Sequence, residues 1–308
     1  MIKEITRHAV CAVALVLFSP HASGVDVFAL SQLEVLSGYE DNRLEESEGG
    51  SGSPYWQVAP ELSLSMLGEK TETTLLLNHR RSKYSKSDFE SKSESGAFVL
   101  WRYFEGNNEA SANIGGGRYE DEALPGDDNS YWQASPCVVR TLERFPLEFS
   151  LRGTVRQTFY DDSVYTTDSA RVDSRLDVRP GMRWHLSRKA TVWAELYAER
   201  NSSDASEAEY EGFGGAVGCG FRPTARLDVG VWTETGIRSY AEQAEDRDRN
   251  DSPWRVGAWT TYRLRPWIEL FASADFESAA STIAGNEYSW WQVGGGVRFV
   301  FEHALTSR

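Results

Sequence analysis

The sequence predicts an all-β protein, a transmembrane antiparallel up-and-down β-barrel of about fourteen strands with short periplasmic turns and long acidic outer loops. Three observations predict this fold. Apolar and polar residues alternate with a period of two along almost the whole chain. Short connections alternate with long ones, and aromatic residues collect at the ends of the apolar rows. Such alternation gives each strand one apolar face and one polar face.

Each expected strand is a segment of roughly ten residues in which every second residue is apolar. In the segment 171–186, for example, Arg171, Asp173 and Arg175 begin a charged row, and the residues between them form an apolar row that ends at Trp184. No segment repeats with a helical period. In chain order, the expected strands are 30–40, 54–66, 71–82, 94–104, 110–120, 130–141, 146–160, 171–186, 190–200, 209–221, 225–240, 253–264, 267–278 and 288–301.

The connections between these strands fall into two classes. Short turns such as "LGEK" and "LERF" alternate with long polar segments such as "DNRLEESEGGSGS" and the acidic 242–251. Outer-membrane barrels show this alternation, with the short turns in the periplasm. The acidic segments lack the carboxylate spacing of a dedicated calcium loop, so we expect solvated loops.

A secreted β-sandwich would also alternate, but three features favour the membrane. The polar rows are rich in Arg, Asp and Glu, as a water-filled lumen requires. Aromatic residues such as Trp101, Trp184 and Trp254 end the apolar rows, where interfacial girdles lie. Closure into a barrel also removes the exposed edges of so many strands.

The N-terminus has the pattern of a secretory signal peptide. Lys3 and Arg7 precede the apolar run 9–18, and small residues follow up to Gly24. We therefore expect a signal peptide at 1–24, a barrel at 25–301 and a short C-terminal tail at 302–308. The expected location is the outer membrane of a Gram-negative bacterium, in contact with outer-membrane lipid and lipopolysaccharide.

Composition excludes some functions and leaves little for catalysis. The net charge of −14 argues against a nucleic-acid partner. After the signal peptide the histidines are His79, His185 and His303, and no serine or aspartate can be tied to them by register. No metal-ligand spacing appears, so we expect no enzyme activity, metal or cofactor. Cys137 and Cys219 fit two small wall residues better than a disulfide.

Charged residues that face the lumen form the candidate site. Folding the hairpins about their turns places Arg156 near Arg175, Arg152 near Arg179, and Arg179 near Glu199. Like charges that close are unfavourable unless water or an anion intervenes. The sequence therefore predicts a basic strip beside acidic residues, which either selects solutes or only braces the wall. The strip comprises Arg152, Arg156, Arg175, Arg179 and Arg183, and the acidic residues beside it include Glu195, Glu199 and Asp228.

Four aromatic residues also fall on inward rows: Trp193, Tyr197, Trp232 and Trp259. They either offer stacking faces to sugar rings or fill the barrel interior.

Short motifs carry three resemblances. Gly296-x-x-Phe299-x-Phe301 resembles the C-terminal signal that the barrel-assembly machinery reads, although "EHALTSR" follows it. In size and strand number the chain is similar to monomeric fourteen-stranded porins. "GYEDN" (38–42) and "QVAPELSLSM" (57–66) resemble barrels encoded in exopolysaccharide-secretion loci.

These resemblances imply a porin-like channel for small hydrophilic solutes, including anionic or saccharide ones. The alternatives are an accessory barrel of an exopolysaccharide secretion system, working with polymer-export partners, and a structural surface barrel with a plugged lumen.

Overall fold

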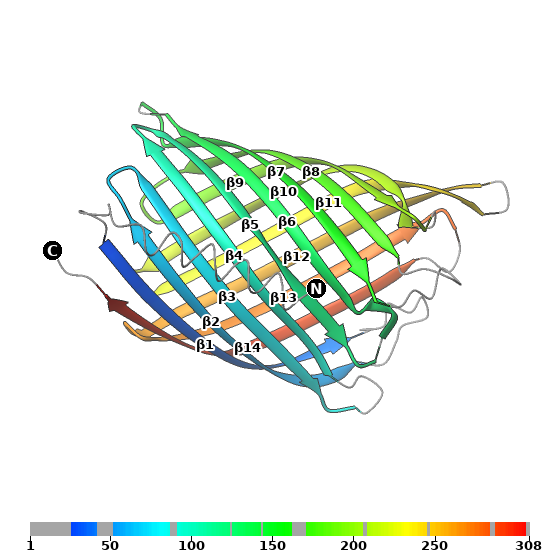
Figure 1. The fold of residues 1–308 in the computed structure, drawn as a ribbon, viewed down its shortest axis with the longest axis horizontal. Helices are drawn as coiled ribbons and strands as arrows, with labels where there is room; N and C mark the ends of the chain where they lie inside the picture. Colours follow the sequence, from blue (N-terminus) through cyan, green and yellow to red (C-terminus); the bar gives the residue numbers. More distant parts are fainter. Residues whose placement is uncertain are drawn as a thin grey trace.

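The computed structural model describes residues 26–41, 52–86, 91–123, 125–142, 144–161, 171–205, 208–244, 247–283 and 287–305. Within these residues, fourteen antiparallel strands close into a single barrel (Figure 1). Each strand pairs with its neighbours in chain order, and β14 pairs with β1. The predicted fold class is confirmed. The expected signal peptide, 1–24, lies outside the described residues.

The strands follow the period-two segments of the sequence. They are β1 (Asp26–Asp41), β2 (Ser53–Leu67), β3 (Thr71–Tyr84), β4 (Ser91–Glu105), β5 (Asn108–Asp121), β6 (Asn129–Thr141), β7 (Leu147–Tyr160), β8 (Val172–His185), β9 (Ala190–Ser203), β10 (Tyr210–Thr224), β11 (Leu227–Ala244), β12 (Arg247–Arg265), β13 (Ile268–Ser281) and β14 (Tyr288–Ala304). A 3₁₀ helix, η2 (Pro125–Asp127), lies between β5 and β6. The described residues contain no helix long and apolar enough to cross a membrane.

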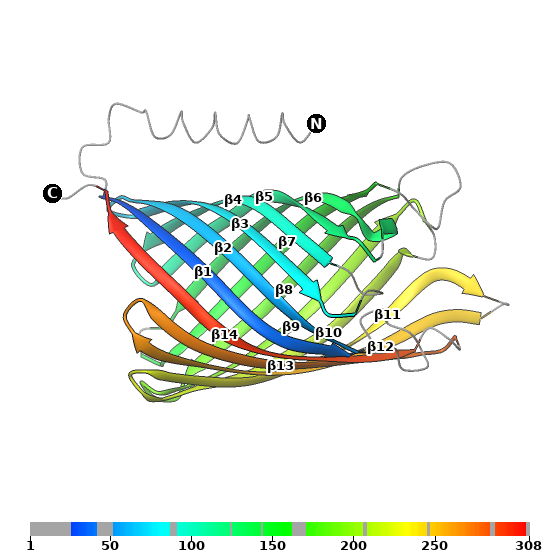
Figure 2. The same ribbon diagram turned by 90° about the horizontal axis from the view of Figure 1, so that it is seen from below.

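The prediction of a long loop between β11 and β12 is wrong. The two strands continue through the acidic segment as a paired hairpin, in which Ser239 lies opposite Asn250 and Ala244 opposite Arg247. The hairpin reaches past the ends of the other strands (Figure 2). The segment looked like a loop because both of its faces are polar. A hairpin that leaves the membrane needs no apolar face, so hydrophobic alternation cannot mark it.

The seam between β1 and β14 closes the barrel and is longer than predicted. Leu36 lies opposite Gly296, and Leu33 opposite Phe299. The expected tail at 302–308 begins inside this ladder, because β1 starts at Asp26 and so gives residues 302–304 strand partners. Inside the barrel, Arg298 Nη2 lies 3.0 Å from Glu34 Oε2 across the seam.

The barrel is apolar outside and polar inside. The outward residues Leu196 and Phe213 are 66% and 62% exposed, whereas the inward acidic residues Asp177 and Glu199 are both 5% exposed. An apolar belt around a charged interior suits lipid outside and water inside.

Aromatic pairs mark both edges of the apolar belt. Near the short turns, the ring of Trp267 stacks on Phe301 at 6.3 Å. Near the long connections, Tyr39 stacks on Trp291 at 5.1 Å. These outward pairs occupy the positions of two interfacial girdles, and they set the height of the membrane on the barrel.

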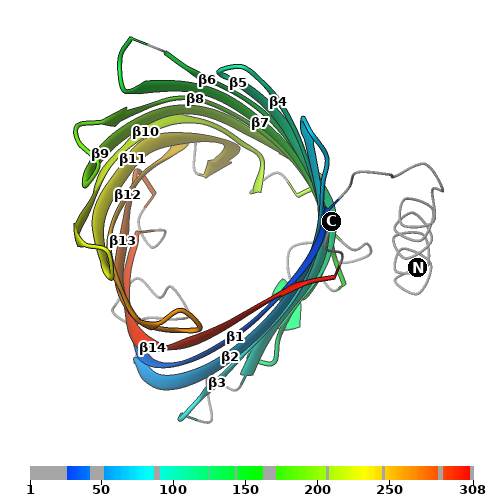
Figure 3. The same cartoon turned by 90° about the vertical axis from the view of Figure 1, so that its left-hand side faces the viewer.

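The two ends of the lumen differ in packing. The end view shows the strands enclosing one oval space (Figure 3). Among the described residues, the buried polar ones all lie toward the long connections, which we call the long-loop half. They are Glu40, Ser53, Gln57, Ser82, Ser91, Asp121, Asn129, Thr158, Asp173, Asp177, Glu199, Asn201 and Asp251. The short-turn half of the lumen is therefore the less crowded half.

Candidate functional site

The predicted arginine rows of β7 and β8 lie side by side in the lumen wall. Arg152 is opposite Arg179, and Arg156 is opposite Arg175, as folding the hairpin about its outer loop predicted. Arginines at paired positions repel each other unless other charges intervene. The arrangement of the neighbouring strand decides which of them are compensated.

The predicted register between β8 and β9 is wrong by two residues. Glu199 lies opposite Asp177, not beside Arg179. The turn closes with backbone hydrogen bonds between Ser187 and Ala190, yet the ladder above it pairs His185 with Thr191. The ladder is thus offset by one residue from the turn and by two residues from the predicted pairing of Arg179 with Glu199.

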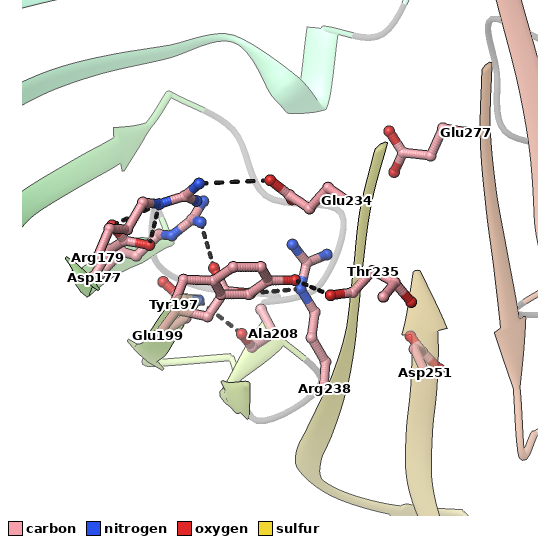
Figure 4. A network of polar contacts seen from close by, with 12 residues as sticks. Asp177, Arg179, Tyr197, Glu199, Ala208, Glu234, Thr235, Arg238, Asp251 and Glu277 are labelled. Atoms are coloured by element: carbon pink, nitrogen blue, oxygen red, sulfur yellow. Dashed lines mark hydrogen bonds and ion pairs between the residues drawn. The ribbon is translucent and has the colours of Figure 1, made fainter. Parts of the chain in front are cut away.

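A balanced ion-pair network results from this register (Figure 4). Glu199, whose side chain is 1% exposed, pairs with Arg175 and accepts a hydrogen bond of 2.8 Å from Arg238 Nε. Arg179 Nε lies 3.0 Å from Asp177 Oδ1, and its Nη1 lies 3.5 Å from Glu234 Oε2. Three guanidinium groups thus face three carboxylates. Burial of each charge is offset by a partner of opposite sign.

The basic strip is consequently not a row of free positive charge. Arg175 and Arg179 belong to the network, and Arg183 Nη1 lies 3.4 Å from Glu148 Oε2. Arg156 lies over the Tyr131 ring, 3.8 Å from its centroid. Within the described residues, Arg152 makes no ion pair. Arg156 makes no ion pair there either, but its guanidinium lies against Tyr131, so Arg152 is the arginine of the strip whose charge is most available to a solute.

The predicted acidic residues divide in the same way. Glu199 is buried in the network, and Asp228 Oδ1 accepts a hydrogen bond of 2.6 Å from Arg222 Nε near the short turns. Glu195 makes no ion pair in the part of the chain that the structure describes. Arg152 and Glu195 are thus two lumen-wall residues of opposite charge that make no ion pair within the described residues.

Arginine–tyrosine stacks, which the sequence did not reveal, line the long-loop half. Each joins neighbouring strands and places a guanidinium carbon over a tyrosine ring. The pairs are Arg156 on Tyr131 at 3.8 Å, Arg171 on Tyr160 at 4.5 Å, Arg179 on Tyr197 at 5.0 Å, Arg238 on Tyr210 at 5.1 Å and Arg249 on Tyr240 at 3.8 Å. Cation–π contacts of this kind hold both groups in place. The sequence feature that could have revealed these stacks is an inward tyrosine at about the same height as an inward arginine of a neighbouring strand.

The four inward aromatic residues lie against glycines of the adjacent strands. The Trp193 ring lies beside Gly218, and a Cβ on that glycine would meet the ring at 2.6 Å. Trp259 covers Gly230 in the same way, Trp232 covers Gly257, and Tyr197 covers Gly214 and Gly236. The rings therefore lie along the wall and do not plug the lumen. Trp259 is 42% exposed, whereas Tyr197 is 6% exposed.

Gly218→Ala should destabilise the barrel by about 1–3 kcal/mol, because the added methyl group forces the Trp193 ring off the wall. Gly220→Ala is the matched control on the same face of β10, where the nearest atom would be 3.9 Å away. Urea unfolding followed by tryptophan fluorescence compares the two. Equal midpoints would contradict the packing role of Gly218.

A large cavity occupies the short-turn half of the lumen. It has a volume of about 1070 Å³, and its lining includes Asn113, Gln133, Cys137, Arg152 and Glu195. Most of the lining is polar, and Arg152 projects into it without an ion pair in the described residues. The cavity is a place where water and small polar solutes fit.

The two cysteines are free and face opposite sides of the wall. Cys137 lines the lumenal cavity, opposite Arg152 on β7. Cys219 is on the outward row, between Val192 and Val231. The expectation of two separate wall residues matches this geometry, but Cys137 faces water in the lumen and not the apolar side.

The expectation that no serine could be tied to His79 is wrong. His79 lies opposite Ser95 across β3 and β4, with 2.8 Å between Nδ1 and Oγ. Both residues are on the outward row, and no carboxylate contacts His79 within the described ranges. His185 contacts Thr191 and Glu148 in the lumen instead.

No group of three or more His, Cys, Asp or Glu side chains in the described residues is arranged to hold a metal ion. The carboxylates near η2 illustrate why closeness of acidic side chains is not enough to form a metal site. Asp128 Oδ1 accepts a hydrogen bond of 2.6 Å from the Asp121 backbone N–H. Burial, together with the nearby Asp121 carboxylate, raises the pKa of Asp127.

Comparisons with known proteins give a likeness of fold. No family model and no curated protein sequence matches the chain. Among solved structures, OmpT of Vibrio cholerae, an outer-membrane protein, is similar with a TM-score of 0.53 and 10% identity over 91% of this chain and 99% of that one. CdiB from Acinetobacter baumannii has a TM-score of 0.50 and 9% identity, covering 88% of this chain and 60% of that one. The chain therefore has the fold of the outer-membrane β-barrels: a closed antiparallel barrel of fourteen strands with an apolar outer face and a charged lumen.

Proposed function

We propose that the protein is an outer-membrane channel for small hydrophilic solutes, including anionic and saccharide ones. The observation that carries this proposal is the lumenal cavity of about 1070 Å³ with its polar lining. Small solutes can exchange their hydration for the side chains of such a wall. The fold of the chain supports an outer-membrane location, with the short turns in the periplasm.

Cys137 offers a native reporter for an open lumen. In planar bilayers we expect steady single-channel currents, which a negatively charged methanethiosulfonate reagent should reduce. The Cys137 thiolate attacks the reagent's sulfur, a methanesulfinate leaves, and the mixed disulfide adds a negative charge opposite Arg152. A positively charged reagent of similar size should change the current by a different fraction than the negative reagent does, because the charge that it adds has the opposite sign.

Cys137→Ser is the control, since it should keep the current and abolish the effect of both reagents. Cys219 faces the lipid side, so it should not respond to charged reagents in water. Absence of any open-channel current would favour a structural barrel with a plugged lumen. A current that persists unchanged after complete labelling of Cys137 would contradict this cavity as the conducting path.

A second candidate function is an accessory barrel of a polymer-export system, favoured by the short-turn end. Five exposed arginines on these turns or at the strand ends beside them make no ion pair within the described residues: Arg140, Arg144, Arg188, Arg226 and Arg265. In a protein with a net charge of −14, this basic rim is a local exception. An acidic polymer or an acidic partner arriving from the periplasm would meet it first. Neutralising all five should weaken secretion in cells without altering the single-channel current.

A further inference from the structure

A second cavity lies against the lumen wall from β12 round to β4. Its volume is about 460 Å³, within the range of about 300–1000 Å³ that small-ligand sites occupy. The sequence pattern did not single out this region. Its lining includes Leu36, Gln57, Arg80, Trp259, Phe271 and Gln292.

The cavity has one open aromatic face. Trp259 is the most exposed of the four predicted lumen aromatics, at 42%, and part of its indole lies against Gly230, so the remaining ring surface is open to a ligand. Phe271 does not offer such a face, because the Arg298 guanidinium lies 5.2 Å above its ring. An indole face attracts flat groups that carry apolar C–H bonds, such as one side of a sugar ring.

Polar groups surround this aromatic face at fixed positions. Gln292 Nε2 donates a 2.6 Å hydrogen bond to Tyr55 OH, and Gln57 Oε1 accepts one of 3.1 Å from Ser82. These contacts hold each amide in place. Within the described residues, the Gln57 amide N–H₂ group and the Gln292 Oε1 atom make no hydrogen bond, so they can serve hydroxyl groups of a ligand.

Among the charged side chains that line the cavity, Arg80 alone makes no ion pair within the described residues. Arg298 is compensated by Glu34 at 3.0 Å and Glu269 at 3.3 Å, and Lys92 pairs with Glu40 at 3.2 Å. Arg80 is exposed and makes no ion pair within the described residues. A carboxylate is the group that a free guanidinium binds with paired hydrogen bonds.

We propose that this cavity is a binding subsite for acidic saccharides, with a sugar ring on Trp259 and its carboxylate on Arg80. The proposal deepens the channel function and rests on it, since a ligand must enter the lumen to reach the subsite. Apolar solutes fit less well, because Gln57, Gln292 and Arg80 would lose water without gaining a partner.

Isothermal titration calorimetry of the full-length protein in detergent micelles tests the subsite, with digalacturonate as the probe. We expect saturable binding, and at least tenfold weaker binding for Arg80→Gln, since a charge-assisted hydrogen bond is lost. Arg80→Lys should retain part of the affinity. Trp259→Leu should weaken binding more than Trp259→Phe, because leucine has bulk but no π-face. Arg200→Gln, on the outward row of β9, is the control for net charge and should bind like the wild type.

Titrations with two further compounds define the ligand class. The neutral disaccharide lactose should bind more weakly to the wild-type protein and be insensitive to Arg80→Gln. Glutarate, a dicarboxylate without a sugar ring, should be insensitive to Trp259→Leu. Binding of glutarate as tight as that of digalacturonate would overturn the saccharide assignment. Equal affinity for lactose would overturn the role of Arg80.

Bilayer recordings on the same preparations separate this proposal from the channel function. Open-channel current without calorimetric binding of digalacturonate would overturn the subsite and leave the channel intact. Binding that depends on Trp259 and Arg80, with no open-channel current, would support the subsite and contradict the channel.

Discussion

Glu199→Gln should lower the free energy of unfolding by about 3 kcal/mol, which is near the low end of the losses seen when a buried ion pair is broken. The Glu199 side chain is 1% exposed and is shared by Arg175 and Arg238. Without its charge, two guanidinium groups keep their positions but lose their counter-ion. The cost stays at the low end because these arginines are 39% and 29% exposed and retain some water. Urea unfolding of the barrel in lipid vesicles measures the loss.

Glu195→Gln is the matched control, on the same strand and the same face. Glu195 makes no ion pair in the described residues, so its neutralisation should change stability by no more than about 0.5 kcal/mol. Adding Arg238→Gln to Glu199→Gln should recover part of the loss, because the double variant removes one uncompensated charge. Equal losses for Glu199→Gln and Glu195→Gln would show that the network does not brace the wall.

Arg152→Glu should shift the preference of the channel toward cations by at least tenfold at low salt. A unit charge about 5 Å from a passing ion contributes roughly 0.8 kcal/mol in water, and reversing its sign doubles the change. Arg152 is suited to this test because it lines the cavity and makes no ion pair within the described residues. Reversal potentials across a salt gradient measure the preference. The effect should shrink at 1 M salt, where the screening length falls to about 3 Å.

Arg200→Glu makes the same charge change on the outward row of β9, beside Glu211. It should leave ion preference unchanged, because the wall separates it from the lumen. Arg175→Gln should act mainly on stability, since the charge of Arg175 is already compensated by Glu199. An equal shift in reversal potential for Arg200→Glu and Arg152→Glu would contradict the placement of the solute path beside Arg152.

Period-two alternation predicted the strands and their two faces, because a bilayer on one side and water on the other impose it along each strand. It also predicted that Arg152 would face Arg179, since the hairpin of β7 and β8 keeps a regular register. It failed where one residue at a turn decides the pairing. Ser187 pairs with Ala190 in the turn, but His185 pairs with Thr191 in the ladder above it. In this register Glu199 forms its ion pair with Arg175 and not with Arg179.

The acidic-saccharide subsite could not be predicted from the pattern for a different reason. Leu36 and Phe271 are apolar residues on rows that face the lumen, where alternation leads one to expect polar residues. The cavity also joins residues from strands at both ends of the chain, such as Arg80 and Trp259. Only closure of the barrel brings them together, so neither periodicity nor local spacing records the site.

The seam contact between Arg298 and Glu34 has a consequence for the order of events during folding. The two residues are 264 positions apart, so their hydrogen bond joins strands from opposite ends of the barrel sequence, and earlier pairing of the strands between them makes the contact easier to form. Closing so long a loop carries an entropic cost that local hairpins do not have. Arg298 also contacts Glu269 on β13, which pairs with β14 as a local hairpin. Arg298 can therefore bind Glu269 within the β13–β14 hairpin before β1 pairs with β14. Its contact with Glu34 then reports that the barrel has closed.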